Sequence, residues 1–185
     1  MPMRTRLVCA SILLAVPAVL AAFAVSPLAA QADAPTGYRA DLLRDLTGIE
    51  EKVVGLAEAI PADKYGWRPS EGVRSISEAM MHLAAANYFF PTLFGTAVPS
   101  GVDMAGLEKI TDQKQVVSTL ESSFEHLRTM VRNTPEDKLD DAIKMFGQDA
   151  TVAGGLHSAV SHGHEHLGQL IAYARSVGVT PPWSE

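Results

Sequence analysis

The chain has 185 residues, enough for one domain with a real hydrophobic core and too few to expect two. Its 21 acidic residues outnumber its 15 basic ones, and the formal net charge at pH 7 is −6. This excess of negative charge argues against nucleic acid as a partner. The single cysteine, Cys9, lies in the first apolar stretch, so disulfides and a cysteine nucleophile are excluded from the rest of the chain.

The first 32 residues have the pattern of a secretory signal peptide. A short basic start precedes an almost wholly apolar run over residues 7–25, and small residues follow up to Ala32. Cleavage is therefore expected after Ala32, which leaves a periplasmic or secreted domain of residues 33–185 with no stable membrane insertion. The alternative is an uncleaved anchor, because the apolar run could span a bilayer, but Pro17 interrupts it.

The first half of the remaining chain has the spacing of two amphipathic helices. Apolar residues recur every three or four positions between Thr36 and Ile60, and a proline then ends the pattern. Ser75 and Glu78 have the spacing of a capping box, in which each side chain bonds a free backbone N–H of the other residue. This box predicts a second helix that ends near Phe90, just before a proline.

The second half predicts two more helices. One begins at Thr111 and ends at Asn133, and another begins after the candidate cap Thr151 and ends near Gly178. A polar link around Phe146 joins them. Since residues 33–185 show no strand-like alternation, the sequence predicts an all-α fold, a four-helix bundle.

Three histidines have the placement of metal ligands. At about 100° per residue, His162 and His166 lie about 40° apart and one turn removed on the same helix. Both flank the apolar stripe of that helix, and His82 flanks the stripe of the second helix. Two helices could therefore present three imidazoles to one ion and leave a further position open, as in catalytic zinc sites.

Histidine spacing alone leaves other interpretations open. A single histidine in a bundle is more often a surface or hydrogen-bonded residue, and we expect this of His126, His157 and His164. The zinc-protease motif is excluded, because it needs glutamate directly after the first histidine of the pair, and Gly163 follows His162.

Motifs near both ends of the domain occur together in a known family. Residues 60–69 and 75–84 in the first half, and residues 162–170 with prolines 181–182 near the end, resemble the DinB-like (DinB/YfiT) family in the same order. The resemblance covers nearly all of residues 33–185. It implies a four-helix bundle and a three-histidine site.

The resemblance maps the site onto His82, His162 and His166 and implies a divalent metal ion, zinc or nickel. Some relatives are thiol-dependent transferases or isomerases, and others are regarded as metal-dependent hydrolases. This chain has Leu167 where many relatives have arginine. Reduced thiols are scarce outside the cytoplasm, which disfavours the thiol-dependent role.

Together these features predict an exported DinB-like protein that binds a divalent metal. It would act as a hydrolase or transferase on a small-molecule substrate. Glu165 and Glu78 are candidates for orienting a ligand or moving a proton, although Glu78 also suits a capping role. The alternatives are a non-catalytic metal or small-ligand binding protein of the cell envelope and a bundle whose histidines bind nothing. Assembly as a homodimer is left open.

Overall fold

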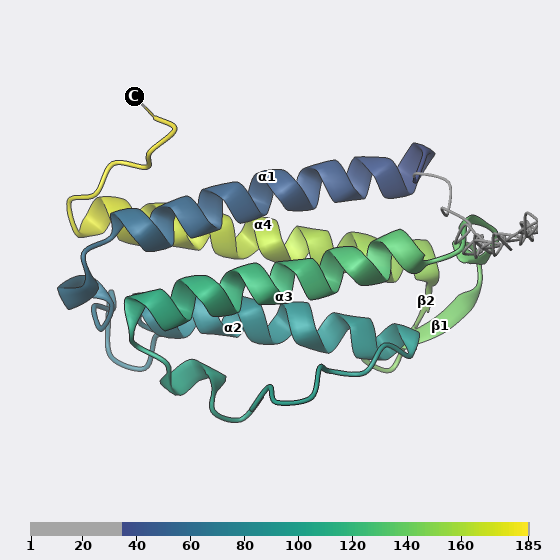
Figure 1. Ribbon diagram of the computed structural model, residues 1–185, viewed down its shortest axis with the longest axis horizontal. Coiled ribbons are helices and arrows are strands. Elements are labelled where there is room, and N and C mark those ends of the chain that lie inside the picture. Colours follow the sequence, from purple (N-terminus) through teal and green to yellow (C-terminus); the bar gives the residue numbers. More distant parts are fainter. Residues whose placement is uncertain (1–34, 185) are drawn as a thin grey trace, which may run out of the picture. The chain divides into compact units, whose positions relative to one another are not determined.

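The computed structural model describes residues 35–184 and confirms the predicted bundle. The predicted signal peptide, residues 1–32, lies outside the described residues. The four helices are α1 (Gly37–Ala59), α2 (Ile76–Phe89), α3 (Gln113–Asn133) and α4 (Val152–Ser176) (Figure 1). Within residues 35–184, no helix combines the length and the apolar character needed to cross a membrane.

The order of the helices around the bundle places α2 beside α4. Helix α1 packs on α3 and α4, and α2 packs on the same two helices. Helices α1 and α4 run in one direction while α2 and α3 run in the other (Figure 1). Because α2 and α3 are parallel neighbours, the chain between them must return along the bundle. This return segment, residues 95–112, contains a short 3-10 helix, η3 (Leu107–Lys109), that contacts α2.

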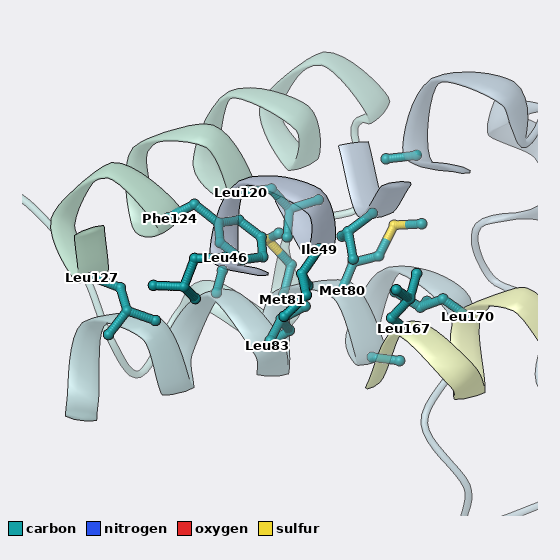
Figure 2. Packing of buried hydrophobic residues seen from close by; sticks show 14 of the residues in the cluster. Leu46, Ile49, Met80, Met81, Leu83, Leu120, Phe124, Leu127, Leu167 and Leu170 are labelled. Carbon is teal, nitrogen blue, oxygen red and sulfur yellow. The ribbon is translucent and has the colours of Figure 1, made fainter. Parts of the chain in front are cut away.

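The core is an apolar cluster to which all four helices contribute. Its side chains point toward one another in Figure 2, where the labelled residues are Leu46, Ile49, Met80, Met81, Leu83, Leu120, Phe124, Leu127, Leu167 and Leu170. Burying one such side chain stabilises the fold by about 2 kcal/mol. Two buried polar side chains satisfy each other, since Asn87 Nδ2 donates to Ser123 Oγ at 3.1 Å.

Two of the predicted helix caps are confirmed. The Ser75 hydroxyl accepts from the Glu78 N–H at 3.3 Å, and the Glu78 carboxylate accepts from the Ser75 N–H at 2.7 Å. At the start of α4, the Thr151 hydroxyl accepts from the Gly154 N–H at 3.1 Å. These bonds fix where the two histidine-bearing helices begin.

The predicted start of the third helix is wrong by two residues. The cap is Asp112, whose carboxylate accepts from the Gln115 N–H at 2.9 Å, so α3 begins at Gln113 rather than at Thr111. Asp is a good cap residue, and apolar periodicity alone does not fix the residue at which a helix begins. The Gln113 amide donates to carbonyl groups at the end of α1, including that of Ile60 at 3.0 Å.

The prediction that the domain lacks strands is also wrong. Strands β1 (Ala142–Met145) and β2 (Gln148–Thr151) pair antiparallel as a hairpin that leads directly into α4. The two-residue loop Phe146-Gly147 has φ values of 51° and 81°, the pattern of a type I′ turn. Such turns favour Asn, Asp or Gly at the first loop position, so a phenylalanine there concealed the hairpin.

Candidate metal centre

His82 on α2 and His162 and His166 on α4 converge on one point. One ligand atom from each ring lies within 4.8 Å of the corresponding atoms of the other two rings. Among residues 35–184, this is the one group of three or more potential ligand side chains that is close enough to hold a metal ion. The ring centroids are 5.5 Å apart for His82 and His162, 5.0 Å for His82 and His166, and 4.5 Å for the α4 pair. The predicted convergence is confirmed, and these three residues could hold one metal ion. Their identity as ligands stays a prediction.

The return segment between α2 and α3 supplies a carboxylate that contacts His82. Glu108 Oε1 lies 3.2 Å from His82 Nδ1. Arg74 binds the same carboxylate through two donors, Nε and Nη2, each at 3.1 Å. Glu108 was missed by the sequence analysis because it lies in an irregular segment, where no periodicity relates it to the histidines.

A polar chain along α4 holds the ring of His166. Its Nδ1 lies 2.8 Å from Gln169 Oε1, and the Gln169 amide nitrogen donates to the Tyr173 hydroxyl at 2.9 Å. Gln169 lies three residues after His166, and Tyr173 lies four residues after Gln169. Helical spacing could therefore have indicated both residues. On the same helix, His162 Nδ1 lies 3.8 Å from the Glu165 carboxylate.

The hydrogen bonds at Nδ1 leave Nε2 of His82 and His166 as the nitrogen available to an ion. In His162 the nitrogen available to an ion is Nε2, because this atom is buried and has no hydrogen-bond partner. A buried polar atom without a partner costs about 1–3 kcal/mol unless something binds it. In known metal sites the second histidine nitrogen is typically held by a carboxylate or another polar group, which is the arrangement of His82 and His166 here.

The electrostatics favour the neutral imidazole at His162 and His166, because the pKa of each is lowered. Burial, with the neighbouring His166 and His82, lowers the pKa of His162 to about 4. Burial also lowers the pKa of His166. Burial acts to raise the pKa of Glu108, but hydrogen bonds and charge interactions with Arg74 and His82 lower it overall. The Glu108 carboxylate is therefore ionised. Neutral imidazole is the form that binds a metal.

The two carboxylates predicted to assist the site have different surroundings. Glu78 is engaged by its capping bond to the Ser75 N–H and by Arg68 at 3.0 Å, which agrees with its capping role. The Ser75 hydrogen bond is the main cause of the lowered pKa of Glu78. Glu165 has a largely exposed side chain beside His162, so its carboxylate is accessible to a ligand that approaches this histidine.

The remaining histidines lie away from the cluster, and the surface positions predicted for His157 and His164 are confirmed. The prediction for His126 is wrong, because this residue is half-buried and its Nε2 is buried without a hydrogen-bond partner. His157 and His164 are exposed, and His164 Nε2 lies 2.9 Å from the Asp45 carboxylate on α1. His126 on α3 contacts the ring of Tyr88, with centroids 5.6 Å apart.

A cleft of about 580 Å³ opens beside the histidines. His82, His162 and Glu165 form part of its lining, with Ser158 and Ser161 on α4. The rest of the lining is apolar and comprises Ala85, Ala86, Phe89, Phe90, Met104 and Phe146. A small molecule in this cleft would touch two of the three imidazoles.

The bundle and its histidine cluster define an all-α protein with a candidate metal centre reached through an open cleft. Residues 45–170 match the model of the DinB superfamily, and the chain belongs to this superfamily.

Similar proteins come from three bacteria. YjoA of Bacillus subtilis (strain 168) is 27% identical over 128 residues, covering 68% of this chain and 81% of YjoA. The crystal structure of YjoA, described as DinB-like, matches with a TM-score of 0.61 at 23% identity, over 76% of this chain and 93% of that one.

Two further crystal structures match the fold at lower identity. A DinB-like protein from Bacillus cereus ATCC 10987 gives a TM-score of 0.69 at 15% identity, over 79% of this chain and 98% of that one. A conserved protein from Enterococcus faecalis gives a TM-score of 0.65 at 14% identity, over 76% of this chain and 97% of that one.

Proposed function

We propose that this chain is an exported metal-dependent hydrolase that holds one divalent ion with His82, His162 and His166 and acts on a small-molecule substrate. The observation that carries the proposal is the buried, unpartnered Nε2 of His162 beside two further imidazoles whose Nδ1 atoms are held by polar groups. This donor set suits zinc or nickel. Three protein ligands leave room for water or substrate.

When bound, such an ion would polarise a carbonyl group and make water acidic enough to supply hydroxide near neutral pH. The residues of the chain have distinct parts in this proposal. Glu108 and Gln169 orient the rings of His82 and His166. Glu165 stands at the cleft beside His162 and takes up or returns a proton at its carboxylate.

Hydrolysis is favoured over thiol transfer by the surroundings expected for an exported chain. The cleft lining contains no cysteine, and reduced low-molecular-weight thiols are scarce outside the cytoplasm. Export itself is tested by fractionating cells and sequencing the N-terminus of the protein recovered. An N-terminus at Asp33 supports cleavage, and an intact leader in the cytoplasm contradicts export.

The metal is tested by elemental analysis of the untagged protein. We expect about one ion per chain in the wild type and none in His82→Ala or His166→Ala. His157→Ala is the matched control, since His157 lies on α4 outside the cluster. A wild-type protein that takes up no zinc or nickel contradicts the proposal.

Catalysis is tested separately on the loaded protein with uncharged esters and amides, with and without added thiol. Turnover that is lost in Glu165→Gln while the ion is retained supports the hydrolase. A retained ion with no rate above that of the solvent points instead to a non-catalytic metal or small-ligand binding protein of the cell envelope.

A further inference from the structure

Three phenylalanines form a continuous aromatic wall that leads to the histidine cluster. Phe89 and Phe90 lie at the end of α2, and Phe146 lies at the tip of the hairpin. The rings of Phe89 and Phe146 stack with centroids 6.1 Å apart and an interplanar angle of 24°. Phe90 meets Phe146 edge-on at 6.3 Å and lies 5.9 Å from the ring of His162.

Much of this wall is exposed to solvent. The side chain of Phe146 is 68% exposed and that of Phe89 is 40% exposed. Within residues 35–184 the other exposed large apolar residue is Trp183, which does not line the cleft. Apolar surface concentrated in one concave place is typical of a binding site.

The backbone at Phe146 favours a different residue. Its φ of 51° lies in the left-handed region, which costs a bulky side chain about 1–2 kcal/mol and suits asparagine or glycine. Phe146 gains little burial in return, since most of its side chain is exposed. A bulky apolar residue that opposes its local backbone conformation and still remains mostly exposed points to a role in binding.

The charges of the cleft restrict what it can bind. Its lining contains no lysine or arginine, and Glu165 is its one carboxylate. Away from the ion proposed at the histidines, an anionic group would find no cationic side chain in the lining and would be repelled by Glu165. Helix α4 contributes His162, Glu165 and the two serines to the lining, while α2 contributes His82 and part of the apolar surface.

We infer that the cleft binds an uncharged molecule in which an aryl group is joined to an ester or amide, and that Phe146 determines this specificity. The aryl group packs against Phe146, Phe89 and Phe90, and the carbonyl end lies toward His82 and His162. The orientation of the carbonyl end rests on the proposed function. The aryl site does not, because the phenylalanines form it without an ion.

The aryl site is tested first on metal-free protein with N-phenyl-1-naphthylamine, a neutral aromatic dye that fluoresces in apolar sites. We expect the wild type to bind the dye and Phe146→Asn to bind it about tenfold more weakly. Asparagine suits the turn, so this variant should fold. Trp183→Ala is the control and should bind as the wild type does. Absent binding, or equal binding by Phe146→Asn, overturns the inference.

The link to the ion is tested with two hydroxamic acids that share a metal-binding group. Calorimetry on zinc-loaded protein should show benzohydroxamic acid binding about tenfold more tightly than acetohydroxamic acid. In Phe146→Asn this ratio should fall to near one, with the affinity for acetohydroxamic acid unchanged. A ratio near one in the wild type overturns the aryl specificity. If neither acid binds while the dye does, the proposed function fails and the aryl site stands.

Discussion

The carboxylate of Glu108 lies 3.2 Å from Nδ1 of His82, although 26 positions separate the two residues in the sequence. The return of the chain between the parallel helices α2 and α3 brings them together, because η3 contacts α2. Arg74 holds the carboxylate through two hydrogen bonds. The imidazole thus has a fixed ring orientation before any ion binds.

We expect Glu108→Ala to weaken zinc affinity by about tenfold, since the loss of such a partner typically costs 10–100-fold. Competition with a chromophoric chelator measures this affinity. Glu121→Ala is the control, because Glu121 is an exposed carboxylate on α3 outside the cluster. Equal affinities of the Glu108→Ala and Glu121→Ala proteins would show that Glu108 does not position the ligand.

The chain from His166 through Gln169 to Tyr173 makes a graded prediction. Gln169→Leu removes the direct partner of His166 Nδ1, so zinc affinity should fall by about tenfold. Tyr173→Phe removes only the group that holds the Gln169 amide, and its effect should be smaller. The same chelator competition measures both variants. A larger loss in Tyr173→Phe than in Gln169→Leu would contradict this order.

The residues that the sequence predicted are those governed by helical periodicity. His82, His162 and His166 were identified because residues one turn apart share a face and because capped amphipathic helices pack by their apolar stripes. Among the residues that escaped prediction, two did so because no helical periodicity governs them. Glu108 depends on the path of an irregular segment, and Phe146 occupies a turn position that phenylalanine rarely takes.

Two helical glycines predict different changes in stability when a methyl group is added. A Cβ at Gly48 on α1 would meet nothing within 4 Å, so Gly48→Ala should stabilise the protein by about 0.5–1 kcal/mol. A Cβ at Gly163 on α4 would lie 3.3 Å from a methyl group of Ile49, which is buried in the core. Gly163→Ala should therefore gain less or lose stability. Urea unfolding of the metal-free proteins compares them, and an equal gain would contradict the packing at Gly163.

The capping box of α2 predicts a pH-dependent contribution to stability. The pKa of Glu78 is lowered from 4.5, chiefly by the hydrogen bond from the Ser75 N–H, so folding favours its ionised form. This contribution is present above pH 4.5 and is lost as the pH falls through the folded-state pKa. Glu78→Gln keeps an acceptor and removes the charge. It should be less stable than the wild type by about 0.5 kcal/mol at pH 7 and by a smaller amount at pH 3.

Urea unfolding at both pH values, on metal-free protein, measures this difference. The two proteins contain the same histidines, so the contribution of the histidines cancels in the comparison. A difference of the same size at both pH values would show that the Glu78 charge is not its source.

The turn at Phe146 predicts that stability and aryl binding change in opposite directions. Phe146→Asn relieves the left-handed conformation and should raise the free energy of unfolding, whereas Phe146→Ala loses the same aromatic contacts and keeps the strain. We expect the asparagine variant to be more stable than the alanine variant by about 1 kcal/mol, and both to bind the neutral dye weakly. Equal stability of the two variants in urea would mean that the turn imposes no cost. Phenylalanine at this position would then need no binding role to explain it.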